Sequence, residues 1–311
     1  MKKKAALVKD KNGFWELYKP ILEQHDYDVQ LLNLFTDFDQ KKMLESQWDV
    51  FIWRAKHNPK ERNPAKRLIY FAESILKLKS YPDWKTFNLF DDKIAQHYFF
   101  YNKQIPCPET FVFYNKEDAI EFSETAQYPI IFKAATGAGS SNVGLLKNKR
   151  ETQRHIKRAF GKGINTFFES DLQKDYVYFQ KFLEGNQGDF RLVCFGERID
   201  GFFRNNRKNK PFASGSYDFD LKELPEDLLN FVDGVNKKLG FDVMSYDLLK
   251  DGVNWVITEM SVVYGDLKDE VYNNCLKYNR TSSGTWQKFS SEENHHVSVF
   301  KHILNKWESN D

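Results

Sequence analysis

A lysine and a run of small residues stand side by side in the stretch 128–146, YPIIFKAATGAGSSNVGLL. Lys133 closes an apolar segment, and Gly137 and Gly139 follow in a loop of glycine, alanine and serine. Small residues let backbone N–H groups approach phosphate oxygens, and a neighbouring lysine would supply a cation to the same phosphates. The pattern therefore predicts a phosphate-binding loop, although a glycine-rich surface hairpin would have the same appearance.

Two well-known phosphate-binding motifs do not fit this loop. A P-loop requires a lysine and a hydroxyl side chain directly after its second glycine, but Leu145 and Leu146 follow Gly144. A dinucleotide-binding Rossmann turn requires a glycine three positions after Gly139, where the chain has Asn142. The design that remains is a strand lysine followed by a glycine-rich loop.

Two carboxylates further along the chain could complete a site. Asp247 and Glu259 lie in two strand-like runs, and the pair Asp251-Gly252 between them is a strong hairpin signal. Paired strands bring facing side chains within reach of each other. Magnesium that also bridges ATP phosphates needs converging carboxylates, so the lysine, the loop and the two acids together predict a nucleotide and metal site.

The elements that must position these residues change in character along the chain. Over residues 1–90, short apolar runs alternate with helical patterns, which predicts an open, parallel α/β unit. Beyond the glycine loop, strand signals separated by turns dominate and predict antiparallel pairing. The predicted fold class is therefore α/β followed by α+β.

In their order and spacing these segments resemble the ATP-grasp superfamily over about residues 91–265. The matching segments are DDK at 91–93, IPCPET at 105–110, the loop stretch at 128–144, FQKFLEG at 179–185, the hairpin at 188–204 and YDLL…ITEMS at 246–261. The resemblance implies an ATP-grasp fold with an N-terminal parallel α/β domain at 1–90. It also implies a central subdomain with a glycine-rich flap at 91–171 and a C-terminal subdomain with the metal site at 172–311.

The resemblance implies a nucleotide site assembled from several segments. Lys93 and Lys133 would reach the phosphates, a hinge at 180–183 would bind the adenine edge through its backbone, and Asp189 would meet the ribose. The implied nucleotide contacts are Lys93, Lys133, Gly137, Gly139, Ser140, Ser141, Gly144, Gln180, Lys181, Phe182, Leu183 and Asp189.

The resemblance also implies catalytic and metal-binding residues. Arg204, together with Arg191, would stabilise the transferred phosphoryl group. Asp247, Glu259 and Ser261 would hold Mg²⁺, or Mn²⁺ in its place. The family usually ends its metal motif with Glu-x-Asn, so Ser261 would be a shorter and weaker ligand.

The implied enzyme is an ATP-dependent carboxylate–amine or carboxylate–thiol ligase, similar to glutathione synthetase and the ribosomal-protein glutamate ligases. ATP would phosphorylate a small-molecule or peptide carboxylate, and an amine would then displace the phosphate to form an amide. An acidic sugar, an amino acid or a peptide would each fit. The residues expected near the substrate are Arg54, His57, Arg207, Lys208, Lys210, Ser214 and Gly215. Two alternatives stay open, a nucleotide-binding protein without turnover and a phosphotransferase that forms no amide.

Charge and composition limit the binding partners and the cellular location of the protein. With a net charge of +2 over 311 residues, the chain lacks the basic excess of a dedicated nucleic-acid binder. No segment approaches the roughly 20 apolar residues of a membrane span, and the apolar run at 5–8 is too short for a signal peptide. Three scattered cysteines in such a chain indicate reduced thiols and a cytoplasmic protein. A homodimer stays open.

The last predicted helix, within 292–307, carries three histidines. These residues, His295, His296 and His302, could bind a metal only with a further ligand. They are expected on the solvated face of that helix.

Overall fold

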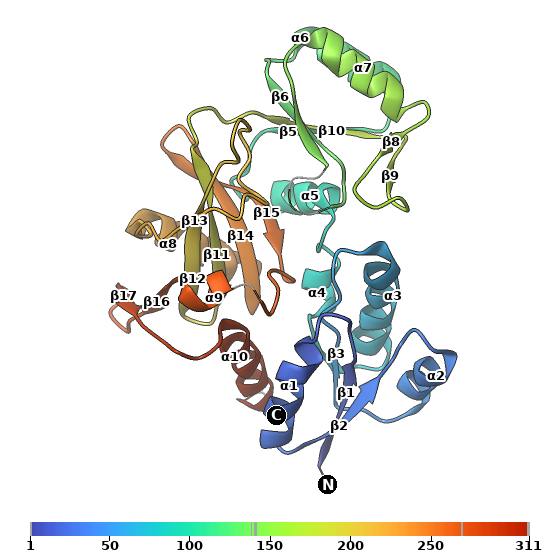
Figure 1. Cartoon of the computed structure of the whole chain (residues 1–311), viewed down its shortest axis with the longest axis vertical. Coiled ribbons are helices and arrows are strands. Elements are labelled where there is room, and N and C mark those ends of the chain that lie inside the picture. Colours follow the sequence, from blue (N-terminus) through green and yellow to red (C-terminus); the bar gives the residue numbers. More distant parts are fainter. Residues whose placement is uncertain (1, 138, 140–141, 269, 310–311) are drawn as a thin grey trace.

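The computed structural model describes residues 2–137, 139, 142–268 and 270–309. Three sheets dominate these residues, and Figure 1 shows the N-terminal sheet at one end of the long axis and a small sheet at the other. A larger antiparallel sheet lies beside and between them.

The N-terminal sheet is parallel, with the strand order β2-β1-β3-β4. Its strands are β1 (Lys3–Val8), β2 (Tyr27–Leu32), β3 (Val50–Ile52) and β4 (Lys79–Tyr81). Its helices are α1 (Phe14–Gln24), α2 (Asp37–Glu45), α3 (Pro59–Tyr70), which continues as the π-helical turn η1 (Phe71–Ile75), and α4 (Trp84–Phe87). Strands that run parallel need a crossover between them, and the helices supply it. The predicted open, parallel α/β unit is confirmed.

The small sheet is antiparallel, with the order β5-β10-β6-β7. Its strands are β5 (Thr110–Phe113), β6 (Ile130–Lys133), β7 (Val143–Leu146) and β10 (Val177–Lys181). Around it lie α5 (Lys93–Lys103), α6 (Lys116–Thr125), α7 (Lys149–Ala159) and the short hairpin of β8 (Ile164–Asn165) and β9 (Leu172–Gln173). Because β10 pairs with β5 and β6, this sheet extends past the domain boundary expected at 171.

The large sheet has the order β15-β14-β11-β12-β16-β17, and β13 pairs with β12. Its strands are β11 (Gly188–Phe195), β12 (Arg198–Asn205), β13 (Phe219–Asp220), β14 (Val243–Asp251), β15 (Asn254–Ser261), β16 (Leu276–Arg280) and β17 (Trp286–Phe289). Its helices are α8 (Glu226–Leu239), α9 (Glu270–Asn274) and α10 (His295–Ser309). All of its strand pairs are antiparallel, as predicted for the second part of the chain.

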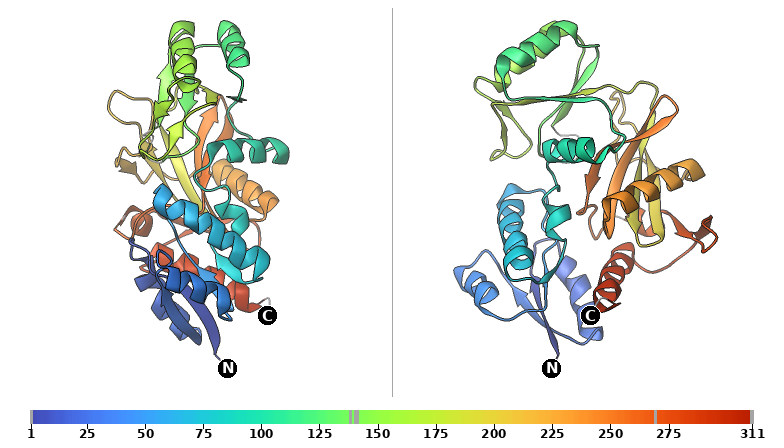
Figure 2. Two further views of the ribbon diagram at one scale, coloured as in Figure 1. Left: turned by 90° about the vertical axis from the view of Figure 1, so that its right-hand side faces the viewer. Right: turned by 180° about the vertical axis from the view of Figure 1, so that it is seen from behind.

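Helix α10 returns the chain to its beginning. It packs beside α1, and both views of Figure 2 show the two termini at the same end of the molecule. Tyr18 of α1 stacks on Phe300 of α10 with ring centroids 4.1 Å apart, within one core cluster that also contains residues of the large sheet. The N-terminal domain is therefore packed directly against the large sheet.

This packing corrects the expectation for the terminal histidines. His295 and His296 are buried, and His302 is half-buried, because the face of α10 that carries them lies in the core between α1 and the large sheet. The His295 ring lies 2.7 Å through Nδ1 from the buried Asp200 carboxylate and 3.0 Å through Nε2 from the Tyr264 hydroxyl.

Candidate active site

Two adjoining cavities lie where the large sheet, the small sheet and the N-terminal domain meet. The first, here the hinge pocket, is bounded by the chain from Gln180 to Leu183 and is lined by Lys93, Lys133, Gly137, Asp189, Asp247 and Glu259 among others. The second, here the arginine pocket, has a volume of about 250 Å³. Its lining includes Lys56, His57, Arg191, Phe202, Arg204, Ser214, Phe219, Ser245, Asp247, Glu259, Ser261, Tyr264, Asp266 and Tyr272. The two pockets share Ser214, Asp247 and Glu259.

The shared carboxylates face each other across the β14–β15 hairpin. Asp247 pairs directly with Glu259, and the pairing register then shifts between Asp247 and Leu248, which leaves Thr258 as an extra residue in β15. Such a bulge re-aims neighbouring side chains, and here both acids line both pockets. The turn at Gly252, with a φ of +63°, sets the pairing register as far as Leu248, and the bulge changes it at Asp247.

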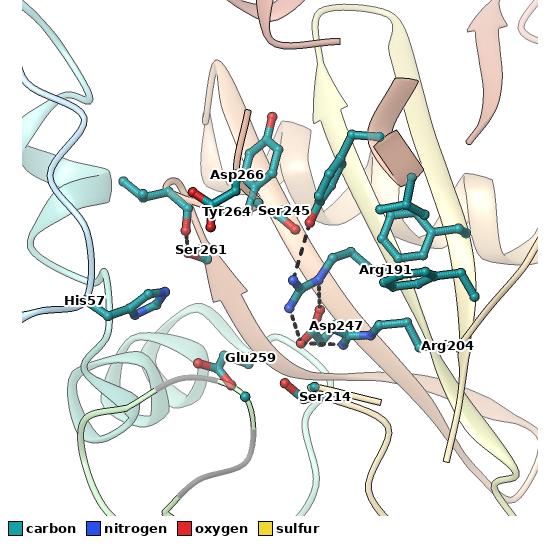
Figure 3. A pocket seen from close by; sticks show the side chains of 18 of the residues that line it. His57, Arg191, Arg204, Ser214, Ser245, Asp247, Glu259, Ser261, Tyr264 and Asp266 are labelled. Carbon is teal, nitrogen blue, oxygen red and sulfur yellow. Dashed lines mark hydrogen bonds and ion pairs between the residues drawn. The ribbon is translucent and has the colours of Figure 1, made fainter. Parts of the chain in front are cut away.

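Two arginines converge on Asp247 (Figure 3). Arg191 binds it with two hydrogen bonds of 2.7 Å, and Arg204 Nη2 lies 2.8 Å from its Oδ2. Arg204 also forms a two-pronged pair with Asp189, with both contacts at 2.7 Å. Burial would raise the pKa of Asp247, but the two arginines hold it well below its usual value. Asp247 is therefore ionised, and its Oδ1, with one arginine contact, keeps a lone pair for a metal ion.

Two lysines lie on the other side of the carboxylate pair. Lys93 is the first residue of α5, and its Nζ donates 2.8 Å to the Gly137 carbonyl and lies 3.2 Å from Glu259 Oε1. Burial would lower the pKa of Lys93, but Glu259 and other nearby carboxylates raise it. In contrast, burial lowers the pKa of Lys133 to about 8, and the neighbouring Lys93 adds to that effect.

Lys133 is the last residue of β6 and is only 8% exposed. Within the described part of the chain, no hydrogen bond or ion pair is found for its Nζ, although its backbone carbonyl accepts a hydrogen bond from Gln173. A desolvated ammonium without a partner is costly unless an anion binds to it. The side chain therefore suits an anionic ligand in the hinge pocket.

The glycine loop divides into positions with different roles. Gly137 and Gly139 have φ values of +112° and +62°, a backbone region that favours glycine. Gly144 lies within β7, where an added Cβ would come within 2.4 Å of the Phe132 ring. Gly144 is thus required by packing and does not line the hinge pocket. Ser140 and Ser141 lie outside the described residues.

The hinge pocket has an apolar part, here the apolar slot, and one oriented amide. The slot is lined by Pro108, Ile131, Val143, Leu183 and Leu249. Gln180 Nε2 donates to Thr110 Oγ1 at 2.9 Å and to the Tyr178 hydroxyl at 3.1 Å, which leaves its carbonyl oxygen as an acceptor. The Lys181 side chain is paired with Asp251 at 2.9 Å and its backbone N–H donates to Glu109, so neither group of Lys181 serves as a donor to the slot.

Of the residues expected near a substrate, some line the arginine pocket and others do not. His57, Ser214 and Gly215 do. Arg207 donates to the carbonyls of Gly139 and Ser214 and so joins the glycine loop to the loop after β12.

Arg207 lines neither pocket, and the remaining three residues also lie outside both. Lys208 and Lys210 are exposed. Arg54 is buried under the Phe14 ring, 3.7 Å from its centroid, and donates to the Tyr264 carbonyl. The basic side chains of the 204–210 turn were expected at a substrate, but this turn directs Lys208 and Lys210 to solvent.

The structure adds pocket residues that sequence reasoning missed. Phe202 lies two positions before Arg204 in β12, so the alternation of a strand would have placed it on the same face. Tyr264, Asp266 and Tyr272 follow β15 in irregular chain and in α9, where no such periodicity exists. Their place in the pocket depends on tertiary packing alone.

The protein offers few side chains as ligands for a metal ion at this site. Ser261 lines the arginine pocket, but its hydroxyl donates to the Val263 carbonyl. Among the residues that the structure describes, no group of three or more Asp, Glu, His or Cys side chains is arranged to hold a metal. Asp247 and Glu259 would therefore bind a hard cation together with oxygens of a bound phosphate and water, which is how Mg²⁺ is usually held at nucleotide sites.

Comparison with known proteins relates the chain to ATP-binding domains and to a ligase. A family model described as the ATP-binding domain of the carbamoyl-phosphate synthase L chain matches residues 92–188. The chain is 24% identical over 253 residues to the alpha-aminoadipate–LysW ligase LysX of Saccharolobus solfataricus, an alignment that covers 76% of this chain and 84% of that protein.

Solved structures show the same fold over the whole chain. A RimK-domain ATP-grasp protein of Sphaerobacter thermophilus matches with a TM-score of 0.57 at 15% identity, covering 97% of this chain and 98% of its own. The D-alanine–D-alanine ligase of Bacillus anthracis complexed with ATP matches with a TM-score of 0.63 at 12% identity over 100% of both chains. The ATP-grasp fold predicted from the sequence is confirmed.

A search of the described helices finds none with the length and apolar character needed to span a bilayer.

Proposed function

We propose that this chain is an ATP-dependent ligase that activates a substrate carboxylate as an acylphosphate and joins it to an amine. The ligase relatives named above support this class of enzyme, an ATP-dependent carboxylate–amine ligase. The observation that supports it most strongly is the position of Asp247 and Glu259 in the wall between two pockets. A phosphoryl group that passes from nucleotide to carboxylate must cross such a boundary.

In this proposal the hinge pocket holds ATP. The apolar slot binds the adenine ring, and the side-chain carbonyl of Gln180 accepts a hydrogen bond from the 6-amino group of that ring. Lys93, Lys133 and the Gly137 backbone neutralise and orient the phosphates. Mg²⁺, or Mn²⁺, bound by Asp247 Oδ1 and Glu259 would neutralise charge that develops on the phosphate oxygens.

The arginine pocket holds the carboxylate and the amine. Arg191 and Arg204 are fixed by Asp247 and Asp189, so their remaining N–H groups are pre-organised for an anion that forms there. The volume of about 250 Å³ suits an amino-acid-sized molecule or the end of a peptide. Aromatic side chains of Phe202, Phe219 and Tyr272 line its wall, and with substrates bound they would limit the access of water that hydrolyses an acylphosphate.

In this proposal the protein acts in the cytoplasm. That the chain forms a homodimer stays a prediction. All three cysteines are free, and Cys194 and Cys275 are buried.

Two measurements on the full chain test the proposed function. Calorimetry should detect MgATP binding, and release of phosphate should depend on a carboxylate from a panel of acidic sugars, amino acids and peptides. Hydroxylamine in place of the amine should trap the activated carboxylate as a hydroxamate. A stable phosphorylated product would favour a phosphotransferase, and binding without phosphate release a nucleotide-binding protein. Absence of MgATP binding at millimolar nucleotide would refute the proposal.

Ser261 provides a test of the metal site. Ser261→Asn places a longer carbonyl arm at the position of the family's usual asparagine, so the Mg²⁺ concentration for half-maximal turnover is expected to fall by about tenfold. Ser261→Ala, the control, should leave that concentration unchanged because the hydroxyl is already engaged with Val263. Titration of Mg²⁺ against turnover distinguishes the forms. An unchanged metal curve for Ser261→Asn would place residue 261 away from the metal.

A further inference from the structure

A series of polar contacts joins the N-terminal domain to the carboxylate pair. Arg62, on α3, pairs through Nη1 with Asp91 Oδ2. The other oxygen of Asp91 accepts a hydrogen bond of 2.7 Å from the Gly137 N–H, and the Gly137 carbonyl accepts one of 2.8 Å from Lys93 Nζ. Lys93 Nζ lies 3.2 Å from Glu259 Oε1. An arginine of one domain is thus connected to a proposed metal ligand of another.

The second arm of Arg62 reaches the same loop by another route. Its Nη2 lies 2.8 Å from Asp171 Oδ2, in the connection between β8 and β9. That oxygen also accepts a hydrogen bond of 2.9 Å from Thr136 Oγ1. Because Thr136 directly precedes Gly137, the two arms of one guanidinium fix the start of the glycine loop from two sides.

The central carboxylate of this network is held in an uncommon state. Asp91 is 2% exposed and has a φ of +52°, a backbone conformation that non-glycine residues keep only where their surroundings enforce it. Burial would raise its pKa, but His57, Lys93 and Arg62 lower it, so the carboxylate is ionised. His57 Nδ1, on the wall of the arginine pocket, lies 3.4 Å from the oxygen that binds Gly137.

We propose that Arg62 is a positioning residue for nucleotide binding. Through Asp91 and Asp171 it orients the Thr136–Gly137 backbone, and through the Gly137 carbonyl it sets the Lys93 ammonium beside Glu259. The inference rests on the proposed function, since it takes Lys93 and Gly137 to contact phosphates. A buried ion pair is by itself weak evidence of a role in stability. Here the acids that Arg62 binds also accept hydrogen bonds from the glycine loop, which points to positioning.

A graded set of variants tests the proposal by calorimetry with MgATP on the full chain. Arg62→Met removes both arms, and the dissociation constant is expected to rise by about ten- to hundredfold, the effect typical of removing partners that orient ligand-binding groups. Arg62→Lys keeps the charge but cannot span two carboxylates, so an intermediate constant is expected. The matched control is Arg67→Met, because Arg67 lies on the same helix, is exposed and forms a side-chain hydrogen bond only with the Asn63 carbonyl among the described residues.

The outcomes separate positioning from a purely structural role. A weaker constant for Arg62→Met with partial recovery in Arg62→Lys supports the proposal. A wild-type constant with a reduced number of binding sites would mean that Arg62 only stabilises the fold, and it would overturn the proposal. A dissociation constant for Arg62→Met within twofold of that of Arg67→Met would also overturn the proposal. If Arg62→Met does not fold, Arg62→Lys and Asp171→Asn, each expected to weaken binding by about tenfold, decide the question in the same way. Absence of MgATP binding by the wild-type chain would overturn the proposed function and this inference with it.

Discussion

Arg204→Lys is expected to lower the turnover number by about a hundredfold or more, while the MgATP dissociation constant changes by less than about fivefold. Arg204 lies in the arginine pocket and not in the hinge pocket, so it would act on charge that develops as the phosphoryl group leaves the nucleotide. Lysine keeps the charge but loses the planar two-pronged contact with Asp189 and the contact with Asp247. Steady-state kinetics and calorimetry measure the two quantities separately.

Arg198→Lys is the matched control for this variant. Arg198 lies on the same strand and forms an equivalent two-pronged pair with Asp200, at 2.7 and 2.8 Å, but it lines neither pocket. Loss of this two-pronged pair should lower the melting temperature about as much as Arg204→Lys does, but it should leave turnover near the wild-type value. If both variants lose turnover equally, Arg204 has a structural role only. If Arg204→Lys instead weakens MgATP binding as much as turnover, its assignment to the transition state is wrong.

Lys133→Met is expected to raise the MgATP dissociation constant by about ten- to hundredfold, because a charge-assisted hydrogen bond contributes about 1.5–3 kcal/mol. The side chain is buried, and among the described residues its ammonium has no partner that binding would have to displace. Lys149→Met, on α7 of the same subdomain, is the control because Lys149 is exposed and pairs only with Glu124 in the described structure. Calorimetry at pH 7 gives the comparison.

The pH dependence of binding tests the same assignment independently. In the free protein the pKa of Lys133 is about 8, and a bound phosphate would raise it, so binding takes up a proton above pH 8. The MgATP dissociation constant should be constant below pH 8 and should rise by up to about tenfold per pH unit above it. Lys133→Met should lose this dependence. An identical pH profile in the variant would show that another group titrates.

Local patterns in the sequence predicted the β14–β15 hairpin that carries Asp247 and Glu259. The turn at Asp251-Gly252 fixes the register of β14 and β15 as far as Leu248, and the bulge at Thr258 then brings Glu259 opposite Asp247. The same holds for Lys133, which ends a short strand immediately before the glycine loop. The ATP-grasp fold was recognisable because these local units occur in a fixed order.

Other parts of the site could not be read from local pattern. Arg191 faces Asp247 because β11 pairs with β14, which lies far from it in the sequence. The arginine therefore balances the negative charge of a carboxylate that the sequence alone presents as a free metal ligand. The network of Arg62 with Asp91 and Asp171 joins three segments that lie far apart in the sequence, and no local pattern links α3 and the β8–β9 connection to DDK at 91–93. Such contacts depend on how whole elements pack, which periodicity does not encode.

The sequence by itself predicted the ATP-grasp fold, two candidate phosphate lysines and a hairpin that carries Asp247 and Glu259, because each of these predictions depends on local patterns and on their order along the chain. Tertiary structure alone decided that His295 and His296 are buried, that Arg54 lies in an aromatic core and that Lys208 is exposed. The physical reason is that burial is set by the partner surface. The α10 helix has the same amphipathic pattern in isolation, but the packing of α1 against it determines which of its polar residues are removed from water.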